Sequence, residues 1–159
     1  MYQLLMSHVY QFNHKHSLFM SADYSKKIIR SDALVDTEQI GFAQAVQAGP
    51  WLYLAGQVGW LKDFSLPGDG GLEAQAEQTM RNIQILLEAA GASFSDVVRF
   101  YLPDLTVEKR GLVRKLLQTY FDRKSPPVST LIGVARLAAS ELLIEIEITA
   151  CLPSVSNDG

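Results

Sequence analysis

Residues 72–90 alternate between apolar and polar positions with the three- and four-residue spacing of an amphipathic helix. Six apolar side chains share one side of this predicted helix: Leu72, Ala76, Met80, Ile83, Leu87 and Ala90. Gly91 follows as a typical helix stop signal. A second helix is predicted to begin after a cap at Asp104 or Thr106 and to end at the proline pair 126–127.

Strand patterns surround these two helices. Residues 43–48 alternate small and polar side chains, the turn signal Gly49-Pro50 follows, and residues 51–58 are mostly apolar, so these segments predict a β-hairpin. Three further strands are predicted at residues 97–102, 128–137 and 142–151. The order ββαβαββ predicts one α/β (α+β) domain in which both helices pack on one face of a single sheet.

The last predicted strand separates two kinds of side chain. Its alternation places Ile144, Ile146, Ile148 and Ala150 on one face and Glu145, Glu147 and Thr149 on the other. The isoleucine face is expected to meet the helices, and the carboxylate face would ordinarily meet solvent, as in many antiparallel sheets. However, residues 51–54 are apolar on both faces, which favours a second subunit over that face. Carboxylates in such an interface would lose water and their pKa would rise, as acid/base catalysis requires.

Composition excludes several classes of protein. With 48% hydrophobic and 19% charged residues, the 159-residue chain has the make-up of a folded domain, and no apolar stretch is long enough to cross a membrane. The net charge of −3 argues against nucleic-acid binding, which needs a basic surface. Cys151 is the single cysteine, which excludes internal disulfides and multi-cysteine metal sites, and we expect a cytoplasmic protein.

The chain is interpreted as one domain with an appendage at each end. The three segments are an N-terminal extension that the domain can dispense with (1–25), the domain itself (26–152) and a flexible tail (153–159). A metal site at His14 and His16 is the alternative for the extension, but this pair has no third ligand nearby. We therefore predict no metal.

Seven segments resemble sequence motifs of the RidA/YjgF family of reactive imine/enamine deaminases, and together they extend over about residues 26–152. They are 41–46 (GFAQAV), 54–59 (LAGQVG), 75–83 (QAEQTMRNI), 90–98 (AGASFSDVV), 126–127 (PP), 134–137 (VARL) and 144–147 (IEIE). The resemblance implies a chorismate-mutase-like fold, assembled as a homotrimer with a cleft between each pair of neighbouring subunits. It also implies that a small-molecule imine or enamine is hydrolysed there to a keto acid and ammonia, without a cofactor.

The same resemblance implies site residues. Glu145 matches the glutamate that positions or activates water, and it is the expected catalytic residue. Gly56 and Gln57 match the turn whose backbone binds substrate, where a glycine lets a ligand approach closely. Phe42 matches the aromatic residue that lines the cleft, although archetypal members have tyrosine there. Ser129 stands where the family carries the arginine that clamps the substrate carboxylate.

The serine at position 129 leaves several interpretations open. A guanidinium binds a carboxylate through a charged, bidentate contact, whereas serine offers one uncharged hydroxyl group. Ser129 and Thr130 would hydrogen-bond the substrate, and Arg114 on the second predicted helix is a candidate replacement for the clamp. Alternatively, the substrate lacks that carboxylate, or the protein binds without catalysis.

Three functions follow from these alternatives. The leading hypothesis is a RidA-like hydrolase that deaminates a reactive imine or enamine in a cleft between subunits. The second is a pathway-specific deaminase or tailoring enzyme on the same scaffold. The third is a non-enzymatic homotrimer that binds metabolites. In each case we expect a small-molecule ligand, and neither nucleic acid nor a membrane as partner.

Overall fold

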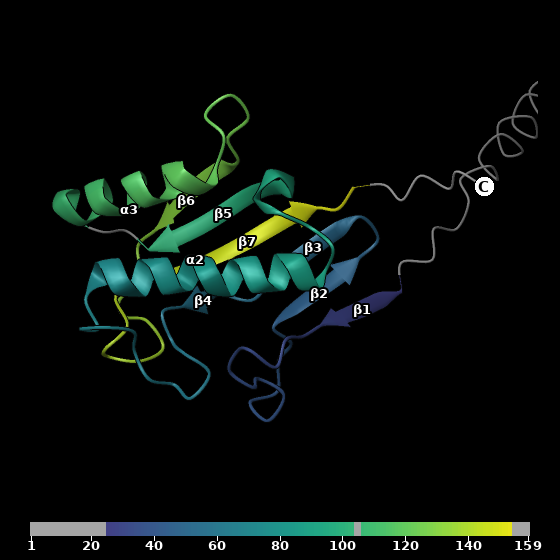
Figure 1. The fold of residues 1–159 in the computed structure, drawn as a ribbon, viewed down its shortest axis with the longest axis horizontal. Coiled ribbons are helices and arrows are strands. Elements are labelled where there is room, and N and C mark those ends of the chain that lie inside the picture. Colours follow the sequence, from purple (N-terminus) through teal and green to yellow (C-terminus); the bar gives the residue numbers. More distant parts are fainter. Residues whose placement is uncertain (1–24, 104–105, 154–159) are drawn as a thin grey trace, which may run out of the picture.

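The computed structural model describes residues 25–103 and 106–153 (Figure 1). Apart from residue 25, the predicted N-terminal extension with its histidine pair lies outside the described residues. So do the predicted tail beyond Pro153 and the alternative helix cap Asp104.

The described residues form a mixed sheet and two long helices. The strands are β1 (Lys26–Ile29), β2 (Ala45–Ala48), β3 (Trp51–Leu54), β4 (Gln57–Val58), β5 (Val97–Pro103), β6 (Val128–Ile132) and β7 (Glu145–Cys151). The helices are α2 (Leu72–Ala89) and α3 (Val107–Tyr120), with a short 3₁₀-helix, η2 (Phe94–Asp96), before β5.

The sheet follows the order β1-β2-β3-β7-β5-β6, and β4 pairs with β7 outside this path. Among the described strand pairs, β5 and β6 run parallel and the others antiparallel. In Figure 1, β7 lies in the middle of the sheet, α2 crosses it, and α3 lies beside β5 and β6. The predicted α+β fold class, with one sheet and two helices, is confirmed.

The core lies between β7 and α2. Ile144, Ile146 and Ile148 are at most 1% exposed, so the predicted isoleucine face is confirmed. Apolar side chains of α2 such as Met80 and Ile83 are equally buried and belong to the same cluster. Gly91 adopts the left-handed φ of 74° just after α2, which explains why a glycine ends this helix.

The N-terminal half departs from the predicted strands at two places. In β1, both lysines are exposed and Ile29 alone is buried, so no alternation marks this edge strand. The predicted strand at 51–58 is two strands, β3 and β4. The pairing with β2 ends with the bond from the Ala55 amide to the Gln44 carbonyl at 3.0 Å, after which the chain turns away. Strand β4 then pairs with β7 instead of continuing the hairpin.

The C-terminal half departs from prediction between β6 and β7. The strand predicted at 128–137 ends at Ile132, and the one predicted at 142–151 begins at Glu145. The intervening segment is held by α2 rather than by the sheet. Leu143 donates its amide to Oε1 of the buried Gln75 at 2.9 Å, and the Glu141 carbonyl accepts from the same side chain. These bonds replace the strand ladder.

The sheet face opposite the helices carries exposed aromatic side chains. On β3, Leu52 and Leu54 are buried beneath α2, whereas Trp51 is 41% and Tyr53 49% exposed. This confirms the prediction that residues 51–54 present apolar side chains on both faces. Large exposed apolar groups of this kind are typical of surfaces that contact another molecule.

Candidate active site

Glu145 opens β7 beside the short strand β4. The register pairs it with Val58, and its side chain is half-buried. Burial, followed by repulsion from Glu147, raises the pKa of the Glu145 carboxyl above its usual range. None of the hydrogen bonds found among the described residues reaches this carboxyl group. A desolvated carboxyl that has both lone pairs and proton available is suited to general acid/base chemistry.

Gly56 lies directly against this carboxyl group. A Cβ atom at position 56 would stand 2.9 Å from Cδ of Glu145, closer than such atoms approach in proteins. Only glycine leaves room for the acid in its present position, because it has no side chain. The turn between β3 and β4 therefore forms one wall of the space around Glu145.

A cavity of about 160 Å³ adjoins the Glu145 carboxyl, and we call it the carboxylate pocket. Four residues expected in the site line it: Phe42, Gly56, Gln57 and Glu145. Trp60 and Phe64 add two aromatic rings, which meet edge to face at 5.2 Å. Nε1 of Trp60 is a buried donor with no acceptor among the described residues. The pocket thus combines one acid with apolar walls and one available N–H group.

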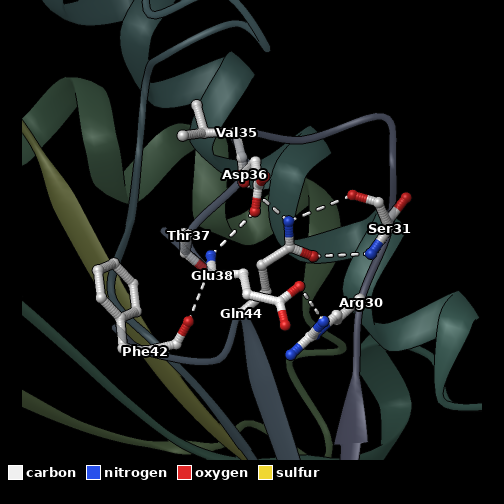
Figure 2. A network of polar contacts seen from close by, with 8 residues as sticks. All are labelled: Arg30, Ser31, Val35, Asp36, Thr37, Glu38, Phe42 and Gln44. Atoms are coloured by element: carbon white, nitrogen blue, oxygen red, sulfur yellow. Dashed lines mark hydrogen bonds and ion pairs between the residues drawn. The ribbon is translucent and has the colours of Figure 1, made fainter. Parts of the chain in front are cut away.

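Buried amide side chains hold the walls of this pocket in place. Figure 2 shows Gln44 lying across the loop that precedes β2. Its Oε1 accepts from the Ser31 amide at 2.7 Å, and its Nε2 donates to the carbonyls of Ser31 at 3.2 Å and Val35 at 2.8 Å. In the same loop, the Thr37 hydroxyl donates to the Phe42 carbonyl at 2.8 Å. The backbone of Phe42 is fixed as a result.

Two amides on α2 hold neighbouring segments of the chain. Asn82 donates through Nδ2 to the carbonyls of Val58 and Trp60, each at 3.0 Å. Gln75 bridges Gly70 and the segment before β7. Each of these side chains is at most 5% exposed, so the bonds they make are shielded from water. Helix α2 therefore ties the loops on both sides of Glu145 to one rigid element.

The other expected site residues lie elsewhere in the subunit. Ser129 and Arg114 line a separate cavity of about 560 Å³, which we call the α3 cavity because it lies between α3 and strands β5 and β6. Thr130 is exposed and pairs with Tyr101 on the next strand. Within one subunit, Phe42, Gly56, Gln57 and Glu145 thus line one cavity, whereas Ser129 and Arg114 line another.

Comparison with known proteins identifies the family. A family model described as Endoribonuclease L-PSP matches residues 21–152. A RutC family protein of Synechocystis sp. is 31% identical over 116 residues, covering 71% of this chain and 87% of that protein. The crystal structure of RidA from the Antarctic bacterium Psychrobacter sp. superposes with a TM-score of 0.70 at 28% identity, covering 79% of this chain and 99% of that one. The chain belongs to the RidA/YjgF family.

A second relative in the RidA/YjgF family carries the name of an activity. A protein of Dermatophagoides farinae named 2-iminobutanoate/2-iminopropanoate deaminase is 31% identical over 106 residues, covering 67% of this chain and 81% of that protein. The resemblance on which the sequence analysis relied is thus confirmed over almost the same residues.

Neither a membrane-spanning helix nor a metal-binding cluster occurs among the described residues. No helix among them is long and apolar enough to span a membrane. No group of three or more histidine, cysteine, aspartate or glutamate side chains in residues 25–103 and 106–153 is placed to hold a metal ion.

The sequence analysis did not predict that three buried amide side chains hold the segments around Glu145: Gln44, Gln75 and Asn82. A signal for the two on α2 exists in their spacing. Three polar residues, Gln75, Thr79 and Asn82, form a second stripe beside the apolar one, and all three side chains are buried. Polar residues repeating at three and four positions next to an apolar stripe indicate a buried polar contact. Gln44 carries no comparable signal, because its side chain bonds to the loop residues Ser31 and Val35, and only the fold brings them together.

Proposed function

We propose that this protein hydrolyses a reactive imine or enamine to a carbonyl compound and ammonia, with Glu145 as the catalytic residue. The observation that carries the proposal is the half-buried Glu145 carboxyl, with its raised pKa, facing Gly56 in an apolar pocket. Relatives support the reaction class. Besides the mite protein, a mouse protein named 2-iminobutanoate/2-iminopropanoate deaminase is 32% identical over 85 residues, or 54% of this chain and 63% of that one.

The reaction needs one water and one group that can exchange a proton. The ionised Glu145 accepts a proton from water as the water oxygen attacks the C=N carbon, and it passes this proton to the imine nitrogen. The resulting carbinolamine then collapses. Its hydroxyl group gives its proton to Glu145 as the carbonyl forms and the C–N bond breaks, and the departing nitrogen takes that proton from Glu145 and leaves as ammonia. An enamine enters the same sequence after protonation at carbon. Glu145 ends in its starting protonation state.

We also propose that the cleft is completed by other copies of the chain in a homotrimer. The support lies on the sheet face opposite the helices. A second hollow, of about 170 Å³, adjoins Glu145 there and includes Glu147, Tyr101 and Ile132. Trp51 and Tyr53 are exposed on the same face. Covering this face with a neighbouring subunit would remove more water from Glu145 and raise its pKa further.

A second candidate function rests on Ser129. If the substrate carboxylate needs the family arginine, this chain would bind an imine-like metabolite in the same cleft without turning it over. Without that arginine the charged bidentate contact with the substrate carboxylate is lost, and a serine hydroxyl restores only one neutral hydrogen bond. Ser129 is exposed on an edge strand, so a longer side chain fits there without disturbing the core.

The test measures ammonia release from imines generated in situ by an amino-acid oxidase. Wild type, Glu145→Gln, Ser129→Arg and Glu141→Gln would be compared, the last being a matched control because Glu141 is exposed and lies outside the carboxylate pocket. Acceleration by wild type and the control, with loss in Glu145→Gln, would support hydrolysis. Acceleration by Ser129→Arg alone would favour the binding protein. Equal rates in wild type and Glu145→Gln would refute the catalytic role.

A further inference from the structure

The carboxylate pocket has room for one ring of a substrate rather than for a whole ligand. Its volume of about 160 Å³ lies below the roughly 300–1,000 Å³ of complete small-molecule sites. An apolar cavity of roughly 150 Å³ is large enough to bind one benzene molecule. Because Glu145 lines the pocket, a group that fills it would be a substituent on the C=N carbon that this carboxyl group serves.

The polar side chains in the lining are already engaged within the protein. Gln44, Asn82 and Thr37 all donate to backbone carbonyl groups, as described above. Gln57 does the same through its Nε2, at 2.9 Å. Glu145 is the one charged residue among the described residues of the lining, so an anionic substituent would be repelled and a cationic one would occupy the catalytic group. Either charge would also lose water against apolar walls.

Aromatic rings form a large part of these apolar walls. Phe42, Trp60 and Phe64 all line the pocket, and the last two meet edge to face with ring centroids 5.2 Å apart. Phe42 and Phe64 are each 49% exposed, so both rings leave surface available to a ligand. Aromatic rings favour edge-to-face and offset contacts with one another, and a ring in the pocket would add to the existing pair. The aliphatic part of the lining comes from Leu34, Val35, Ile40 and Val58.

Phe64 has a backbone conformation that its own packing does not explain. Its φ of 66° lies in the left-handed region, and it is the one residue other than glycine with a positive φ in the described ranges. This conformation is unfavourable for a bulky residue, and such strain is concentrated at functional sites. Half-exposure of the ring means that burial in the core does not offset the strain. A role of this ring in ligand binding would account for it, because the ring lies beside Trp60 in the pocket wall.

We propose that the carboxylate pocket takes an aromatic ring, so that the preferred substrate is an imine or enamine with a benzyl group on the reacting carbon. This inference rests on the proposed function and narrows the substrate class within it. The ring would lie between Phe42, Trp60 and Phe64, while the C=N carbon stays beside Glu145. The methyl or ethyl group of a small aliphatic imine would leave most of the pocket empty and forfeit those contacts.

The test is calorimetric titration of the full chain in its native assembly with two keto acids, phenylpyruvate and 2-oxobutanoate. They are the products expected from the benzyl and ethyl imines, and they differ in the side chain alone, so their affinity ratio reports on the pocket. We expect phenylpyruvate to bind at least about tenfold more tightly, because it buries more apolar surface. The charged side chain of 2-oxoglutarate should make it bind more weakly than 2-oxobutanoate.

Three variants locate the ring. Ala138 is exposed and lines the pocket, so Ala138→Phe should fill the space and remove the preference for phenylpyruvate. Ser140→Phe is the matched control, because it adds the same ring to the same segment outside the pocket, and it should keep the preference. Glycine adopts the φ of Phe64 without strain, so Phe64→Gly should fold normally and bind phenylpyruvate about two- to tenfold more weakly.

Four results would overturn the proposal. They are equal affinities for phenylpyruvate and 2-oxobutanoate, no binding of either at millimolar concentration, equal preferences in Ala138→Phe and Ser140→Phe, and unchanged phenylpyruvate binding in Phe64→Gly. Ammonia release is a separate readout. A chain that prefers phenylpyruvate without accelerating ammonia release would have the aromatic pocket but not the proposed hydrolysis. Acceleration with equal affinities would refute the aromatic pocket and leave the hydrolysis standing.

Discussion

The two helices lie on the same face of the sheet and are packed very differently. Helix α2 buries eight side chains, among them the polar Gln75, Thr79 and Asn82. On α3, Val113 is the one fully buried side chain among those described, although several others pack partly against the core. The α3 side also leaves a cavity of about 560 Å³ against β5 and β6.

This difference in packing indicates that the segments around α2 are held more rigidly than those around α3. Two of these side chains, Gln75 and Asn82, bond to backbone groups of three separate segments, and the bonds of Asn82 fix two residues that line the carboxylate pocket, Val58 and Trp60. Burial makes each of these bonds expensive to break, because the freed group finds no water. On the α3 side, apolar contacts and exposed arginines leave more freedom for sequence change. We therefore expect large effects from changes around α2 and small ones around α3.

The largest effect is expected at the contact between β4 and α2. A Cβ atom at Gly59 would lie 2.7 Å from the Gln75 Cα, a backbone atom that cannot move without shifting the helix. Gly59→Ala should lower the free energy of unfolding by about 3 kcal/mol, as overpacking of a core does. Denaturant unfolding measures this change. Gly133→Ala is the matched control, because no atom lies within 4 Å of its Cβ position; similar losses in both variants would contradict the prediction.

A smaller effect is expected from Asn82→Leu, which keeps the volume of the side chain and removes both of its donors. The carbonyls of Val58 and Trp60 would lose these bonds within the protein, which destabilises the fold by roughly 1–3 kcal/mol. Because Val58 and Trp60 line the carboxylate pocket, ammonia release should also fall. Gln84→Leu is the control on the exposed side of α2. If it lost as much stability as Asn82→Leu, the buried bonds would not be the cause.

The titration of Glu145 should appear in the pH dependence of stability. Its folded pKa is raised, first by burial and then by Glu147. The carboxyl therefore favours folding fully below the ordinary glutamate pKa, and this contribution is lost as pH rises through the raised value. Glu145→Gln should gain stability relative to wild type as pH rises through that window. Unfolding measured from pH 4 to 8 tests this; a difference that does not change with pH would contradict the raised pKa.

The sequence predicts the parts of this fold that depend on local periodicity. The stripe of α2 and the isoleucine face of β7 are examples, because one buried face repeats at a fixed spacing. Strand β1 was missed, since it is an exposed lysine-bearing edge. Strand β4 was predicted as part of β3, since only its pairing with β7 separates the two. Their existence depends on neighbours that are distant in the sequence.

The residues of the candidate site could likewise be predicted only in part from local sequence patterns. Phe42, Gly56, Gln57 and Glu145 came from the family resemblance, and the structure places them around one cavity. Periodicity alone could not have joined them, because they belong to three separate segments. The placement of Ser129 in a different cavity also required the fold. Its register with Phe100 decides which face of the sheet it occupies, and no local pattern specifies that register.

The smallest effect is expected on α3, at Gly111. A glycine inside a helix is less favourable than alanine by up to about 1 kcal/mol, because its backbone has more freedom to lose. A Cβ at this position would meet no atom within 4 Å. Gly111→Ala should therefore raise the free energy of unfolding by about 0.5–1 kcal/mol, the opposite sign to Gly59→Ala. Denaturant unfolding of both variants compares the two sides directly. A loss of stability in Gly111→Ala would mean that something packs closely on this side of α3, such as another subunit, and that α3 is as constrained as α2.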